Sequence, residues 1–239
     1  MSEVLSPESE SPPPPGGRGT TTEDLGLRTS DSRRESPLHP GVLLERRLPP
    51  FYASFFYAFP AAVAWIWLYH VDAKRSAELW APPDWAPSLA IGIGAGVLWI
   101  ALSTLFTKSF RWARRLEAEF GWILGSQKKL EILWIALLSG CAEEYLFRGA
   151  LQEKFGIWIA AAVFGAVHWP LNRNFIAWPF LAGVVGLSLG GLRLWTGSLV
   201  APVAAHVLIN AVNLWKISSR FRTWDETQVN AYVDPGKAA

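Results

Sequence analysis

The chain has 239 residues, of which 51% are hydrophobic and 18% are charged, and its formal net charge at pH 7 is +2. So small a charge gives no electrostatic basis for binding nucleic acid, which is therefore not an expected partner. Cys141 is the single cysteine, which excludes an intrachain disulfide. The high apolar content points instead to segments that lie in a membrane.

Residues 1–49 form a polar segment that is rich in Pro, Ser and Thr and contains four consecutive prolines, Pro12 to Pro15. A segment of this composition buries too little apolar surface to offset the entropy of ordering it. We therefore predict a disordered cytoplasmic tail over 1–49, either a plain solvated extension or a docking element. The tail has no apolar core of its own, so it is not a signal peptide, and the apolar run that follows remains as an anchor.

Apolar runs occupy most of the remaining chain, and all but the fourth approach the roughly 20 residues that a membrane-spanning helix needs. The runs are 51–70, 88–107, 131–155, 157–169, 176–196 and 198–215. They predict an all-α fold: a polytopic transmembrane helical bundle of about six spans. The domains expected from this pattern are the tail, a transmembrane domain over 50–216, and a short cytoplasmic C-terminal tail over 217–239.

Residues 109–125, between the second and third runs, place apolar side chains at helical spacing on one face and arginines on the other. This pattern predicts a cationic amphipathic helix that lies in the membrane interface. Lys and Arg gather before the first run, between the second and third runs, and after the last run. The positive-inside rule then places both termini in the cytoplasm, and we expect an integral protein of the plasma membrane.

The third run carries two adjacent carboxylates, Glu143 and Glu144, and an arginine, Arg148. A charged side chain at the middle of a bilayer costs at least about 2.5 kcal/mol, so such groups usually serve a chemical purpose. Glu144 and Arg148 share one face of a helix, which lets Arg148 neutralise Glu144. Glu143 is rotated by about 100 degrees from Glu144 and lacks that partner. A purely structural ion pair is an alternative, but it leaves Glu143 unexplained.

Two histidines lie in later apolar runs. His168 follows Phe164 at a spacing of four in the fourth run, and His206 precedes Asn210 at the same spacing in the last. Lipid offers no hydrogen-bond partners, so polar side chains in a bundle face one another or a water-filled cavity. A lone histidine in an apolar helix is most often a packing residue. Two such helices together with the glutamates favour a shared site.

Three short motifs resemble the signatures of the CAAX protease and bacteriocin-processing family, the Abi group of glutamate-dependent intramembrane endopeptidases. They occur in the family's order and with its internal spacing, between about 129 and 215. The motifs are Glu143-Glu144-x-x-x-Arg148, Phe164-x-x-x-His168 and His206-x-x-x-Asn210. The resemblance implies an enzyme that cleaves peptide bonds within the membrane; eukaryotic members of the family act on prenylated proteins.

The resemblance also implies roles for the matching residues. In the family, a glutamate of the first motif and the histidine of the second activate a water that attacks the scissile amide. Because Glu143 is the carboxylate without a local partner, we assign this general-base role to Glu143 and His168. Glu144, paired with Arg148, would orient the site.

The third motif is thought to stabilise the oxyanion in this family, and here that role falls to His206 and Asn210. Hydrogen-bond donors of this kind are worth about 3 kcal/mol each. No covalent nucleophile is better supported: Cys141 lies roughly 200 degrees around the helix from Glu143, and Ser139 has no adjacent base in the sequence. The expected partners are a membrane-associated protein or peptide substrate and the lipid bilayer.

Two alternatives to a metal-independent peptidase stay open. Two histidines and two glutamates could supply zinc ligands, although the sequence contains no His-Glu-x-x-His element. We expect no cofactor, with zinc as the alternative. A non-catalytic immunity or scaffold protein with the same fold is the other alternative, and the intact motifs disfavour it.

Overall fold

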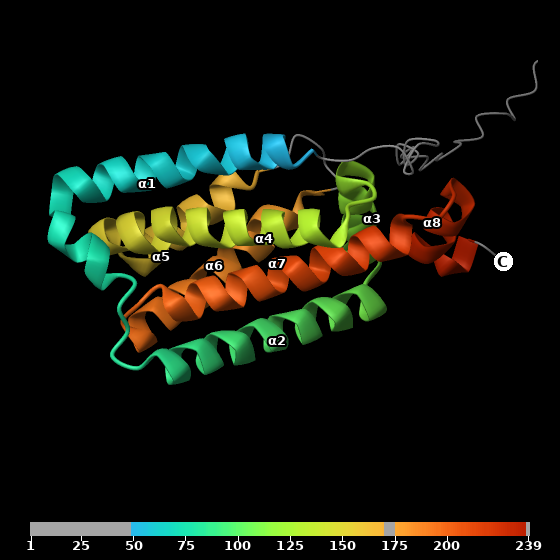
Figure 1. Ribbon diagram of the computed structural model, residues 1–239. Helices are drawn as coiled ribbons and strands as arrows, with labels where there is room; N and C mark the ends of the chain where they lie inside the picture. Colours follow the sequence, from blue (N-terminus) through green and yellow to red (C-terminus); the bar gives the residue numbers. More distant parts are fainter. Residues whose placement is uncertain (1–48, 170–174, 238–239) are drawn as a thin grey trace, which may run out of the picture. The chain divides into compact units, whose positions relative to one another are not determined.

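The computed structural model of the protein describes residues 49–169 and 175–237, and the regular elements in these ranges are helices. The tail expected over 1–49 lies outside the described residues, except for Pro49. Figure 1 shows the elements, which are α1 (Pro50–Glu78), α2 (Trp85–Ser109), α3 (Arg111–Leu124), α4 (Lys129–Glu144), η1 (Tyr145–Leu151), α5 (Gln152–Val167), α6 (Ala177–Thr196), α7 (Val200–Phe221), α8 (Glu226–Val233) and η3 (Pro235–Lys237). The predicted all-α fold is confirmed.

Five helical segments in the described residues are long and apolar enough to cross a membrane. They are Phe51–His70, Trp85–Ser109, Lys129–Val167, Ala177–Thr196 and Val200–Phe221. Their outward faces carry large apolar side chains, such as Phe55, which is 75% exposed, and Trp158, which is 74% exposed. On helices long enough to span a bilayer, a surface of this kind is typical of contact with lipid. The protein is therefore an integral membrane protein built as a helical bundle.

Gly156 reverses the chain direction within the longest of these segments. Its φ of 84° and ψ of 168° belong to a region that glycine adopts far more readily than other residues. The chain then returns along η1, so that the rings of Phe147 and Phe164 lie 4.8 Å apart between centroids. The third and fourth apolar runs of the sequence are thus the two arms of one hairpin. The second arm of the hairpin is too short to count as a span of its own. The structure therefore has five candidate spans in the described ranges, whereas the sequence predicted about six.

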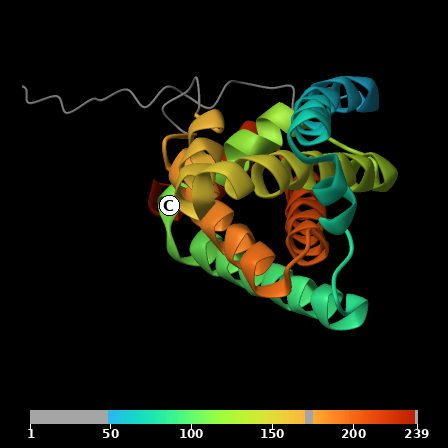
Figure 2. The same cartoon turned by 90° about the vertical axis from the view of Figure 1, so that its left-hand side faces the viewer.

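The helices pack as a layered bundle around α4 and α7. Helix α7 packs on α2 and α4, α1 packs on α4, and α5 packs on α6. In both views α1 and α2 lie on opposite sides of α4 and α7 (Figure 1, Figure 2). Helices α1 and α4 run in the same direction, because Trp134 Nε1 donates to Ser54 Oγ at 2.9 Å and the rings of Trp67 and Phe155 contact further along.

Glycine allows α2 and α7 to approach closely. A Cβ built on Gly92 would lie 2.3 Å from the carbonyl oxygen of Ala201. We expect Gly92→Ala to destabilise the protein by about 1–3 kcal/mol, because the obstructing atom belongs to the backbone and cannot rotate away. Gly94→Ala is the matched control, since nothing lies within 4 Å of a Cβ there. The measurement is thermal unfolding in detergent, and equal midpoints for the two variants would refute this packing of α2 on α7.

The amphipathic helix predicted over 109–125 is α3 (Arg111–Leu124), so its place along the chain is confirmed. Its buried face joins an apolar cluster with α7 and α8 that comprises Ala118, Ile217, Phe221, Val229 and Val233. Arg220 Nη1 donates to both carboxylate oxygens of Glu117, at 2.8 and 2.7 Å, and the Tyr232 hydroxyl also donates to Glu117. Burial and the bond to Glu117 raise the pKa of Tyr232, which keeps the phenol protonated as a donor.

Residues 217–237, which were expected to form a short C-terminal tail, are largely helical. Helix α7 passes the boundary expected at 216 and continues to Phe221, and α8 then packs on α3. Asp225 caps α8, because its side chain accepts from the backbone N–H of Gln228 at 2.8 Å. Residues 217–237 therefore form a folded helical cap on the membrane bundle.

Candidate active site

Four elements bring the sequence-predicted residues together at one place in the bundle. Helix α4 ends with Glu143 and Glu144, η1 carries Arg148, α5 ends just before His168, and α7 carries His206 and Asn210. Glu143 Oε2 lies 4.0 Å from His168 Nε2 and 3.9 Å from His206 Nε2. The three motifs thus converge around one carboxylate.

Glu144 is the centre of a buried charge network. Arg148 Nη1 donates to Glu144 Oε1 at 2.9 Å, with side-chain exposures of 1% and 0%, so the predicted ion pair is confirmed. Arg148 Nη2 also donates to the carbonyl oxygen of Gly186 at 3.0 Å, and the guanidinium lies 4.4 Å from the centroid of the Phe164 ring. Glu144 Oε1 is in addition 2.7 Å from His206 Nδ1. These contacts offset both charges through Glu144 Oε1, while Glu144 Oε2 is buried without a hydrogen-bond partner among the described residues.

Local backbone geometry makes this network possible. Residues Tyr145–Leu151 form a π-helical segment directly after Glu144, and such segments occur frequently at functional sites. A Cβ on Gly186 would lie 3.1 Å from Phe164 Cδ1 and 3.3 Å from Arg148 Nη2. Glycine at this position therefore lets the guanidinium and the Phe164 ring lie against the α6 backbone.

The hydrogen bond of His168 determines which of its ring nitrogens faces Glu143 as a base. Nδ1 lies 2.6 Å from the carbonyl oxygen of Phe164, and a carbonyl only accepts, so Nδ1 carries the hydrogen. In the neutral ring Nε2 then has a free lone pair directed toward Glu143. The imidazole is held between aromatic rings, with centroids at 4.6 Å for Phe164 and 5.6 Å for Trp178.

The hydrogen bond of His206 likewise determines which of its ring nitrogens carries a hydrogen. Its Nδ1 donates to Glu144, because the carboxylate accepts from Arg148 and supplies no hydrogen of its own. The Nε2 atom is then an acceptor in the neutral ring and a donor only in the imidazolium. A role for His206 as an oxyanion donor therefore requires the doubly protonated ring.

Asn210 lies one helical turn after His206 and contacts Ser139, which the sequence motifs do not contain. Its Nδ2 donates to Ser139 Oγ at 2.8 Å. Ser139 is four positions before Glu143, so its helical face was a usable signal.

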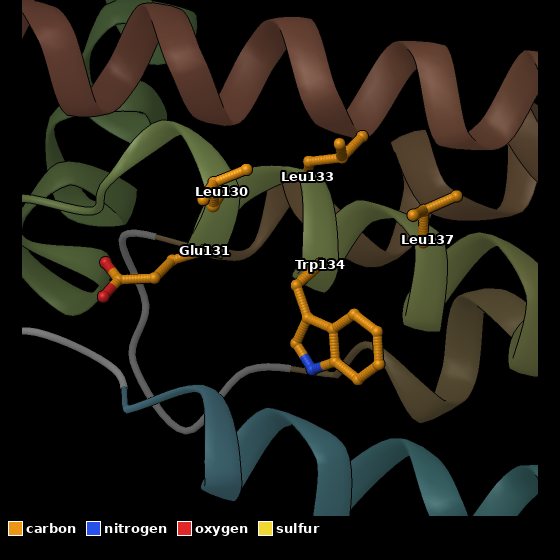
Figure 3. A pocket seen from close by; sticks show the side chains of 5 residues that line it. All are labelled: Leu130, Glu131, Leu133, Trp134 and Leu137. Atoms are coloured by element: carbon orange, nitrogen blue, oxygen red, sulfur yellow. The ribbon is translucent and has the colours of Figure 1, made fainter.

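A groove on the outward face of α4 is separate from this site. Figure 3 shows the side chains that line it: Leu130, Glu131, Leu133, Trp134 and Leu137. Leu130 is 80% exposed, and Trp134 points toward α1. Trp134 precedes Glu143 by nine positions, which is about half a turn around the helix axis. The groove therefore belongs to the surface that the helix presents to lipid.

The fold and the site together define a class: a polytopic membrane protein with a buried glutamate, arginine and histidine site. Comparison with known proteins agrees with this class. Residues 125–212 match the model of the Rce1-like family, described as type II CAAX prenyl endopeptidase Rce1-like. The resemblance carried by the three motifs is thereby confirmed.

A curated relative matches part of the same chain. Over 83 residues the sequence is 41% identical to the uncharacterized protein YpbD of Bacillus subtilis (strain 168), a stretch that is 34% of this chain and 42% of that protein. The matched stretch thus spans about two fifths of the relative's length. No solved structure matches the chain.

Proposed function

We propose that the protein is an intramembrane endopeptidase that hydrolyses a peptide bond in a membrane-associated protein or peptide. One observation carries the proposal: Glu143 has no Arg or Lys ion-pair partner among the described residues, and its Oε2 lies 4.0 and 3.9 Å from two histidine nitrogens. These separations exceed direct hydrogen bonds. They suit one water that contacts the carboxylate and the histidine together.

The reaction follows from these positions. Glu143, assisted by His168 Nε2, removes a proton from the water, and the hydroxide attacks the scissile carbonyl carbon. The carbonyl oxygen becomes an oxyanion that accepts from His206 Nε2–H and from the Nδ2 group of Asn210. The protonated Glu143 then gives its proton to the leaving amine, the carbon–nitrogen bond breaks, and a carboxylic acid and an amine result. Glu144 and Arg148 hold His206 in the required orientation.

We propose that this reaction needs no metal. Glu144 Oε1 is already bonded to Arg148 and His206, so Oε2, which is buried and has no hydrogen-bond partner in the described part of the chain, is the single Glu144 oxygen left to a metal. Across residues 49–169 and 175–237, no three His, Cys, Asp or Glu side chains are grouped in a way that could hold a metal ion. The side chains themselves supply the base and the oxyanion donors in this mechanism.

The proposal also includes the orientation in the membrane. Arg46 and Arg47 precede α1, and Lys128 and Lys129 begin α4. The parallel packing of α1 and α4 agrees with both basic clusters lying on one side. By the positive-inside rule that side is the cytoplasm, so we infer cytoplasmic termini and a plasma-membrane location.

The test uses purified protein in liposomes and a library of membrane-anchored peptides, half ending in a prenylated CAAX tail and half unmodified. We expect cleavage that persists after treatment with a zinc chelator. His168→Ala should lower kcat by about 10²- to 10⁴-fold, because general-base assistance is lost. The matched control is His70→Ala, since His70 is exposed on α1. It should cleave like wild type.

Two other results would favour a zinc-dependent protease or a non-catalytic binding protein. Activity abolished by the chelator and restored by zinc would replace this mechanism with a zinc-dependent one. Peptide binding without any cleavage by folded wild-type protein would indicate a binding or scaffold protein. The half of the library that is cleaved identifies the substrate class.

A further inference from the structure

We propose that Ser139 is a positioning residue that fixes the amide of Asn210 for the oxyanion site. The inference rests on the proposed function. Ser139 lies on α4 and belongs to none of the three motifs. It acts through Asn210 and does not touch the reacting atoms.

Ser139 is buried, with an exposure of 1%, and its hydroxyl makes two hydrogen bonds. The hydroxyl donates to the backbone carbonyl of Ala136 at 3.2 Å. A hydroxyl has one hydrogen and two lone pairs, so Ser139 Oγ is otherwise an acceptor. One lone pair accepts from Asn210 Nδ2 at 2.8 Å.

This arrangement selects one of the two orientations of the Asn210 amide. Rotation of the amide by half a turn would place its oxygen against Ser139 Oγ, whose hydrogen is already engaged with Ala136. Two sets of lone pairs would then face each other, which is unfavourable in a buried site. The second hydrogen of Nδ2 is then available to a substrate oxygen.

A simpler role for Ser139 would be to pack α4 against its neighbours without involving Asn210. The two roles differ in their energetic coupling to Asn210. A positioning role makes the loss of Ser139 redundant once Asn210 is removed, whereas a packing role makes the two effects add. The chain offers a control for a serine that only joins two helices, because Ser54 on α1 accepts from Trp134 Nε1 on α4 at 2.9 Å.

The experiment is a double-mutant cycle on the full chain in liposomes, with the library peptide that wild type cleaves fastest. We expect Asn210→Ala to lower kcat by about 10²-fold. Ser139→Ala should lower kcat by about tenfold with KM within about twofold, since an oriented donor acts mainly in the transition state. The double variant Ser139→Ala/Asn210→Ala should be no slower than Asn210→Ala. Ser54→Ala should keep the wild-type kcat.

Specific results would overturn the inference. Additive losses in the double variant would show that Ser139 acts independently of Asn210. Wild-type kcat in Ser139→Ala, together with lost cleavage in Glu143→Gln, would remove the positioning role while the proposed protease function stands. Absence of cleavage by folded wild-type protein would refute the protease function, and the positioning role with it.

Discussion

Glu143→Gln is expected to lower kcat for peptide cleavage by about 10²- to 10⁴-fold, while the protein remains folded. Glutamine keeps the size and shape of the side chain but cannot accept the proton of the attacking water. Loss of a largely buried charge should leave stability equal or higher, because a neutral amide costs less to bury than a carboxylate. Glu143 has a side-chain exposure of 12%, so this desolvation applies to most of the group.

The measurement compares steady-state cleavage and thermal unfolding of Glu143→Gln with those of Glu153→Gln. The control removes a carboxylate that pairs with Arg193 Nη2 at 2.8 Å, away from the histidines. It should cleave at nearly the wild-type rate. A Glu143→Gln protein that still turns over substrate at the wild-type rate would exclude Glu143 as the general base.

Arg148→Met is expected to produce the largest loss of stability, about 3–5 kcal/mol. The substitution removes the guanidinium from a site with 1% exposure and leaves Glu144 buried without its cationic partner. It also leaves the carbonyl oxygen of Gly186 without the donor at 3.0 Å. The free energy of unfolding in detergent, measured by denaturant titration, tests this expectation.

Two further variants separate the buried pair from ion pairs in general. Arg193→Met breaks the ion pair with Glu153. The side chain of Arg193 is 11% exposed and that of Glu153 is 23% exposed, so we expect a smaller loss of stability than for Arg148→Met. Adding Glu144→Gln to Arg148→Met should recover part of the stability, because the uncompensated charge is then removed. Equal losses for Arg148→Met and Arg193→Met would contradict a special role for the buried network.

Length and hydropathy were sufficient to predict most of the bundle. A run such as 88–107 is apolar throughout, and only a helix satisfies its backbone in lipid, so α2 follows from composition alone. The pairing of Glu144 with Arg148 followed from helical spacing, because residues four positions apart lie on the same face of a helix. The convergence of His168 and His206 on Glu143 required only that polar groups avoid lipid.

Other features depend on tertiary contacts that no local pattern encodes. The positive φ of Gly156 sets the reversal of the hairpin, and the same glycine within a straight helix would look identical in sequence. The bond from His206 Nδ1 to Glu144 joins residues that are 62 positions apart and decides which nitrogen faces Glu143. The bond from Asn210 to Ser139 arises only because α7 packs on α4.

The two adjacent carboxylates have different roles: Glu143 is the general base and Glu144 holds the buried charge network. One paired measurement tests this division. Cleavage rate and unfolding midpoint are measured for Glu143→Gln and Glu144→Gln under identical conditions in liposomes and detergent. We expect Glu143→Gln to lose cleavage and keep its midpoint, and Glu144→Gln to lower the midpoint because Arg148 and His206 lose their shared anionic partner. The reverse pattern, with cleavage retained in Glu143→Gln and an unchanged midpoint in Glu144→Gln, would contradict it.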